Sequence, residues 1–70
     1  MKETLRFYLI TGLDSGREIK PFIIESTIEG LSPYLNVIGD AVRYYEPISE
    51  RQVIAKVREG VELRWNYMVA

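Results

Sequence analysis

The sequence predicts a small α+β domain, and three features of its 70 residues indicate that class. In residues 4–11 and 61–69, apolar or aromatic side chains recur at every second position, which is the two-residue period of a β-strand with one apolar face. Between these two segments, Ser49 and Gln52 have the spacing of a helix capping box, and Gly60 is placed to end that helix. We therefore expect a small antiparallel sheet of four to five strands with one helix packed on one face, in the order β-β-β-β-α-β.

Two strands joined by a turn are expected in the first part of the chain. Residues 4–11 form the first strand, and residues 12–16 contain two glycines and an Asp-Ser pair, which is typical of a hairpin loop. Residues 19–27 are rich in β-branched and aromatic side chains and are predicted to form the second strand. Pro21, near its start, favours a position at the edge of the sheet.

Residues 34–46 allow two interpretations. As a hairpin they turn at Gly39-Asp40 and pair Val37 with Val42, Leu35 with Tyr44 and Asn36 with Arg43. As a helix, with Ser32 as N-cap and Pro33 at the first helical position, residues 33–45 would give the order β-β-α-α-β. We favour the hairpin, because Gly39 would cost a helix interior about 1 kcal/mol and because Val, Ile and Tyr suit strands.

The helix that follows Ser49 is about 11 residues long and marginal in isolation, so it must pack on the sheet. Ile48 and Val53 occupy the two positions of a hydrophobic staple at its start. Its apolar side is expected to consist of Val53, Ile54 and Val57. Residues 61–69 then close the chain as the last strand.

The composition indicates one globular domain spanning residues 1–70. Hydrophobic residues make up 47% of the chain and charged residues 27%, which is far from the composition of a disordered protein. Nine Lys and Arg against ten Asp and Glu give a net charge of −1, so no global field attracts nucleic acid or an anionic membrane. The apolar stretch at residues 7–10 is too short for a signal-peptide core or a membrane span. A cytoplasmic location is therefore expected.

The chain contains few of the residues that enzymes and metal sites usually use. The chain has no histidine and no cysteine, although general acid–base catalysis usually draws on histidine and a nucleophilic serine needs a base beside it. Asp14 and Glu18 are the one close pair of carboxylates in a glycine-containing loop, but they lack the ligand pattern of a calcium loop. We therefore predict that the protein is not an enzyme and has no cofactor and no metal site.

The two faces of the predicted sheet define a core and a candidate binding surface. The face beneath the helix is expected to bury Leu5, Phe7, Leu9, Val42, Tyr44, Leu63 and Trp65. The opposite face would present a set of Arg, Tyr and Asn side chains: Arg6, Tyr8, Arg43, Tyr45, Arg64 and Asn66. Arginine and tyrosine are enriched in protein interfaces and in platforms that bind single-stranded nucleic acid. The alternative is that these long side chains merely cover a solvated sheet.

From these observations we expect a small protein-interaction or regulatory domain that forms a homodimer. Binding would use the Arg/Tyr face or an edge strand near Pro21, with another protein or a second copy as partner. A core of this size, without disulfides or a structural metal, favours self-association. The alternative is a nucleic-acid-binding module that uses the same face, although the chain lacks the aromatic RNP motif and the GXXG loop of common RNA-binding modules.

Overall fold

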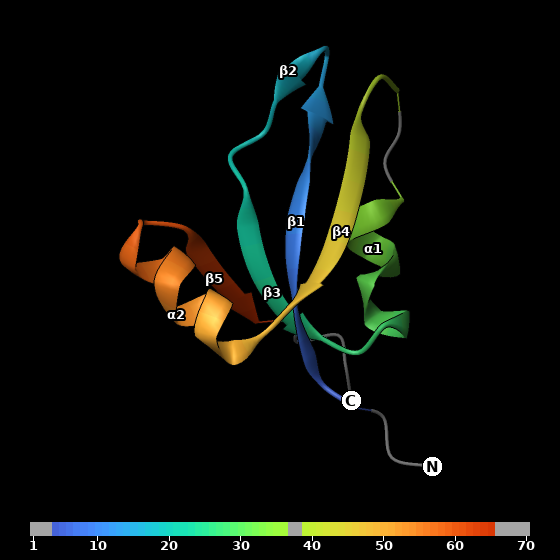
Figure 1. Cartoon of the computed structure of the whole chain (residues 1–70). Coiled ribbons are helices and arrows are strands. Elements are labelled where there is room, and N and C mark those ends of the chain that lie inside the picture. Colours follow the sequence, from blue (N-terminus) through green and yellow to red (C-terminus); the bar gives the residue numbers. More distant parts are fainter. Residues whose placement is uncertain (1–3, 37–38, 66–70) are drawn as a thin grey trace.

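The computed structural model describes residues 4–36 and 39–65, with Trp65 described by its backbone alone. In chain order the elements are β1 (Arg6–Asp14), β2 (Arg17–Glu18), β3 (Phe22–Ser26), the 3-10 turn η1 (Glu29–Leu31), α1 (Ser32–Leu35), β4 (Val42–Ile48), α2 (Glu50–Arg58) and β5 (Glu62–Trp65). They form a five-stranded sheet with helices packed against it (Figure 1). The predicted α+β class, with one main helix on the sheet, is confirmed.

The sheet is organised around β1, which pairs with neighbours on both sides. β4 pairs antiparallel with one side of β1, and β2 and β3 pair antiparallel with the other. β5 pairs with β3 in parallel, so the sheet is mixed and the expectation of a purely antiparallel sheet is wrong at this pair. The reason is that the segment containing α2 carries the chain across the sheet from β4, so β5 runs in the same direction as β4 and β3.

The first hairpin turns later than predicted. Gly12 belongs to β1, and the turn consists of Ser15 and Gly16, whose φ angles are 52° and 80°. Positive φ at both central residues is the geometry of the type I′ turn, which matches the twist of the two strands that it joins. The loop expected over residues 12–16 is therefore limited to its last two residues.

The second arm of this hairpin is interrupted by a bulge. Leu13 pairs with Glu18, and Ile10 pairs with Phe22, so residues 19–21 lie opposite only residues 11 and 12. Of the predicted strand over residues 19–27, residues 22–26 form β3, whereas β2 at residues 17–18 lies before the predicted start. The bulge also explains how Pro21, which has no N–H to donate, is tolerated beside β1.

Residues 34–46 form neither the predicted hairpin nor a continuous helix. Residues 34 and 35 end α1, Gly39 and Asp40 form a turn, and β4 follows from Val42. Pro33 lies in the first turn of α1 as the helical interpretation expects, but the N-cap is Leu31 and not Ser32. The hairpin prediction is wrong because Tyr34 and Leu35 belong to α1, and β4 pairs with β1 instead. Val37 lies outside the described residues.

The main core lies on the sheet face that η1 and α1 cover. Its buried members are Tyr8, Ile10, Phe22, Ile24 and Leu31, with Ile19, Tyr34 and Leu35 packed against them. The rings of Phe22 and Tyr34 lie 6.2 Å apart, which joins α1 to the sheet. On the other face Ile23 is fully buried, and α2 contributes the buried Val53. Both faces are therefore covered in part, and the expectation of one open face is wrong.

The ends of α2 agree with the sequence. The Ser49 hydroxyl accepts a hydrogen bond from the Gln52 N–H at 3.2 Å, and the Ser49 N–H donates to Gln52 Oε1 at 2.8 Å. At the other end the N–H of Gly60 donates to the Val57 carbonyl, and that of Val61 donates to the Lys56 carbonyl, which is a Schellman motif. The capping box and the terminal glycine are confirmed.

Several apolar residues expected in the core are exposed. Leu5, Val42 and Tyr44 are 54%, 40% and 58% exposed, and on α2 both Ile54 and Val57 are exposed as well. Phe7, Leu9 and Leu63 are half-buried, and the side chain of Trp65 is not described. Figure 1 shows the reason: α2 lies beside β5 and away from the upper half of β4, so it cannot cover Val42 or Tyr44. Within residues 4–36 and 39–65, no helix has the length and apolarity needed to cross a membrane.

Candidate interaction surface

The structure places most of the predicted Arg/Tyr set on a single face of the sheet. Tyr45 lies opposite Ile10, Arg43 opposite Gly12, and Arg64 beside Ile24, so these side chains share the face of Tyr8. Arg6 has the same parity on β1, whereas Asn66 lies outside the described residues. The alternation read from the sequence therefore grouped these side chains correctly.

That face is nevertheless the covered core face and not an open platform. Tyr8 is only 4% exposed, so the expectation that it faces outward is wrong. Its ring meets that of Tyr45 edge to face, with 5.9 Å between the centroids. The η1 and α1 segment covers this face, and its side chains Leu31, Tyr34 and Leu35 pack against the core.

The two arginines of β4 and β5 are held by contacts within the chain. The guanidinium of Arg43 donates to the carbonyl oxygens of Leu13 and Val42, at 2.9 and 3.2 Å. The guanidinium of Arg64 lies 3.9 Å from the centroid of the Phe22 ring and 2.9 Å from a carboxylate oxygen of Glu62. The hydrogen bond from Arg64 lowers the pKa of Glu62 below its usual value, and the positive charges of Arg64 and Lys20 act in the same direction. Arg43 thus contacts the neighbouring strand β1, and Arg64 contacts the neighbouring strand β3.

β4 is an edge strand of the sheet. One of its sides pairs with β1 from Val42 to Ile48, and no strand in the described part of the chain pairs with its other side. The Gly12 carbonyl accepts from the Ile19 N–H, so even-numbered residues of β1 direct their backbone groups towards β3 and odd-numbered ones towards β4. The register then leaves the backbone groups of Arg43, Tyr45 and Pro47 facing the free side.

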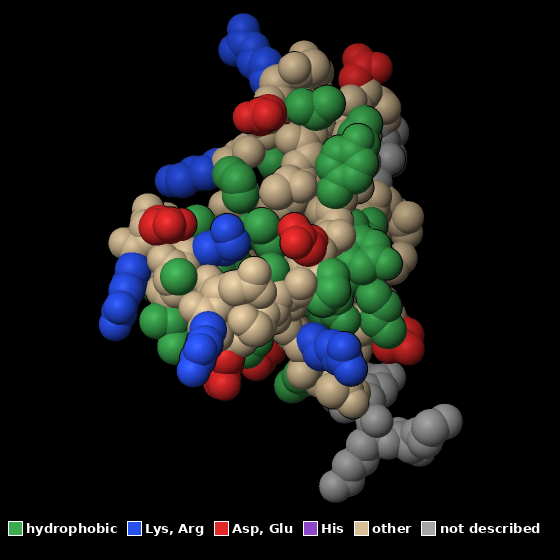
Figure 2. All heavy atoms as spheres, in the orientation of Figure 1, with side chains coloured by type: hydrophobic (Ala, Val, Ile, Leu, Met, Phe, Trp, Pro, Cys, Tyr) green, Lys and Arg blue, Asp and Glu red, His purple; other side chains and the backbone are tan. Residues whose placement is uncertain are grey.

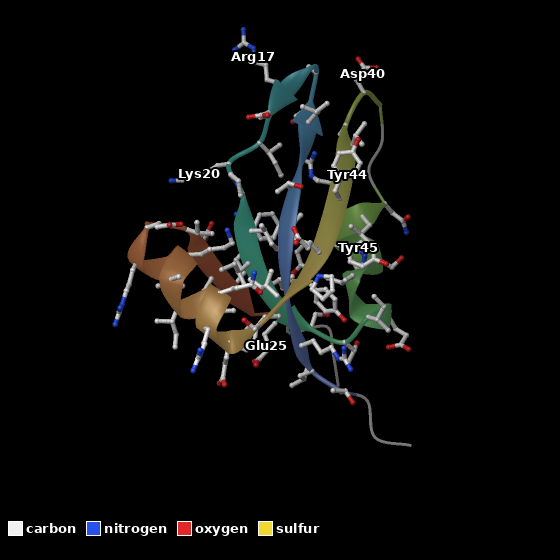
Figure 3. All side chains as sticks on the ribbon, viewed as in Figure 1. Arg17, Lys20, Glu25, Asp40, Tyr44 and Tyr45 are labelled. Atoms are coloured by element: carbon white, nitrogen blue, oxygen red, sulfur yellow. The ribbon has the colours of Figure 1, made fainter. Side chains whose placement is uncertain are left out.

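Exposed apolar side chains accompany this free edge. Val42, Tyr44 and Tyr45 are 40%, 58% and 47% exposed. Figure 2 shows hydrophobic side chains gathered over β4, and Figure 3 shows Tyr45 on the side of β4 that faces α1, below Tyr44. A pocket of about 320 Å³ opens beside Tyr44, lined by Thr11, Gly12, Leu13, Glu18, Ile19, Pro21 and Tyr44. We call the free side of β4, together with Val42, Tyr44 and Tyr45, the β4 edge surface.

Comparison with other proteins gives no further guide. No family model, curated protein or solved structure matches the chain. Among residues 4–36 and 39–65, no group of three or more acidic, histidine or cysteine side chains is placed to hold a metal ion. The candidate site must therefore be judged from the chemistry of its own residues.

The β4 edge surface differs from the surface predicted from the sequence. Arg43 and Tyr45 were included in the prediction, but Val42 and Tyr44 were assigned to the core. One sequence signal could have found them: Pro47 cannot donate in a sheet ladder, so it indicates that β4 lies at an edge.

Proposed function

We propose that this chain is a non-enzymatic protein-interaction domain that binds its partner through the β4 edge surface. The observation that carries the proposal is a seven-residue strand whose outer side pairs with no other strand among the described residues and which bears three exposed apolar side chains. An exposed strand edge offers backbone hydrogen bonds to an added strand, while side chains on alternate faces supply specificity. We further propose a cytoplasmic location, in line with the absence of cysteine.

The residues on this surface suit protein contact. Tyrosine combines a large apolar area with a hydrogen-bonding tip, which is why it is enriched in interfaces. Arg43 and Arg64 are engaged within the sheet, so they offer less to a phosphate backbone than two free arginines would. A protein partner is thus favoured over nucleic acid.

Affinity capture with matched variants tests the proposal. Tyr44→Ser removes the most exposed aromatic of the β4 edge surface, and Ile54→Ser removes an apolar side chain of similar exposure from α2, at 58% and 54%. Both variants should fold, because exposed substitutions usually change stability by less than about 0.5 kcal/mol. Proteins captured from native cell extract by the wild type should be retained by Ile54→Ser and lost with Tyr44→Ser. Equal capture by both variants, or retention of nucleic acid alone, would contradict the proposal.

A further inference from the structure

We infer that the β4 edge surface binds the same surface of a second copy of this chain, antiparallel, with Tyr44 opposite Tyr44. This inference rests on the proposed function of that edge and specifies its partner and register. The result would be one continuous sheet through both copies, with the two β4 strands at its centre. A closed twofold arrangement of this kind pairs the free β4 edge of one copy with that of the other.

The backbone of β4 determines which registers are chemically complete. Arg43 and Tyr45 each direct an N–H and a carbonyl towards the free side, whereas Pro47 directs only a carbonyl. A twofold axis at Tyr44 sets Arg43 opposite Tyr45 of the second copy, and this pair exchanges two hydrogen bonds. The symmetry repeats the pair, so every outward N–H of β4 finds an acceptor.

The two neighbouring registers are less favourable. An axis at Tyr45 sets Arg43 opposite Pro47 of the second copy, where the proline ring would face the Arg43 carbonyl and no N–H could be donated to it. An axis at Arg43 would set two arginines directly opposite each other, and like charges in that position destabilise a pair of strands. The Tyr44 register avoids both problems.

The side chains also favour pairing with an identical edge. Val42 and Tyr44 share one face of β4, so antiparallel pairing at Tyr44 would join the exposed apolar surfaces of the two copies. Tyr44 would meet its own counterpart as a cross-strand aromatic pair, which stabilises antiparallel strands. Natural edge strands are commonly protected by lysine, but β4 contains none, and the guanidinium of Arg43 is turned back onto carbonyls of its own sheet.

Single-cysteine cross-linking of the full chain tests this register, because the wild type contains no cysteine. In the proposed dimer Tyr44 forms a non-hydrogen-bonded pair with itself, at a Cα separation of about 4.5 Å, which suits a disulfide. Val42 lies opposite Glu46 of the second copy, so two Val42 residues are offset by roughly 13 Å along the strands. Three separate variants are needed: Tyr44→Cys, Val42→Cys and Glu46→Cys.

On mild oxidation at high micromolar concentration, a mixture of Val42→Cys and Glu46→Cys, which both keep the Tyr44 ring, should form the mixed disulfide at least about ten-fold faster than either protein forms its own, because these two thiols share a dimer. Tyr44→Cys loses the ring pair but keeps the backbone pairing, so it should also form its disulfide faster than Val42→Cys or Glu46→Cys alone. Equal rates for the mixture and the single variants, or a monomeric mass of the wild type by light scattering, would overturn the inference. The capture experiment with Tyr44→Ser would still decide the proposed function, since a different protein can bind the same edge.

Discussion

The contact between Gly12 and β4 gives the sharpest prediction about stability. A Cβ built on Gly12 would lie 2.0 Å from the Val42 carbonyl oxygen and 3.1 Å from the Arg43 Cα. The Gly12→Ala variant can therefore fold only if β4 moves away from β1 by more than about 1 Å at this point, because the obstacle is backbone and cannot rotate aside. The displacement would weaken the pairing on which the β4 edge surface depends.

The expected cost follows from this overlap. Overpacking usually costs about 1–3 kcal/mol, and the rigid neighbour places this substitution near the upper end of that range. For a domain of this size, a loss of about 3 kcal/mol lowers the melting temperature by roughly 12–24 °C. Thermal unfolding followed by circular dichroism would measure it.

A matched control is available within the same hairpin. Gly16 has φ of 80°, and a Cβ placed there meets nothing within 4 Å. Asparagine tolerates this left-handed conformation, so Gly16→Asn should melt within about 3 °C of the wild type. If Gly12→Ala melted as close to the wild type as this control, the tight approach of β1 and β4 would be refuted.

Three further predictions concern the core, the cap of α2 and the ion pair on β5. Tyr8→Ala should cost about 3–5 kcal/mol as a large core deletion, whereas Tyr44→Ala should cost less than about 0.5 kcal/mol; equal losses on urea unfolding would reject the assignment of the two sheet faces. Ser49→Ala should cost about 0.5–2 kcal/mol because the N-cap is lost, and an unchanged urea midpoint would show that the capping box does not stabilise the fold. The pKa of Glu62 should lie below its usual value, so its ion pair contributes above the ordinary carboxyl pKa and is lost as the pH falls through the lowered one. Arg64→Met should move that pKa upwards in an NMR titration, and an unchanged pKa would exclude the ion pair as its cause.

Local features of this fold could be predicted from the sequence. The start of α2 depends on Ser49 and Gln52 hydrogen-bonding each other's backbone within one turn, and the structure has both bonds. The end of α2 depends on Gly60, which adopts φ of 98°. In both cases all the atoms that decide the outcome lie within a few residues of one another.

The faces of the sheet could not be assigned in the same way. β1 is apolar on both faces, with Tyr8 and Ile10 on one and Phe7 and Leu9 on the other. The main core forms on the face of Tyr8 and Ile10, where Leu31 of η1 packs against them. The sequence analysis placed Tyr8 on the outward face and therefore assigned the two faces the wrong way round. Tyrosine is not a reliable sign of an exposed face, because its large apolar ring can be buried.

The position of β4 was missed because its pairing is not local. The turn at Gly39 was correctly expected. The strand that follows it pairs with β1, which is distant in the sequence, so that Val42 lies opposite Leu13. The same pairing brings the Arg43 guanidinium within hydrogen-bonding distance of the Leu13 carbonyl on β1, a contact that the sequence did not predict. It also left Tyr44 exposed, and the candidate surface thus became visible only in the fold.

Amide hydrogen exchange followed by NMR at two protein concentrations tests the central claim most directly. The amides of Tyr44 and Glu46 face β1, so they should be protected at both concentrations. Those of Arg43 and Tyr45 face the free edge, so they should exchange quickly in dilute solution and become protected at high micromolar concentration as the two β4 strands pair. Equally fast exchange of the Arg43 and Tyr45 amides at both concentrations, with Tyr44 and Glu46 still protected, would contradict the account.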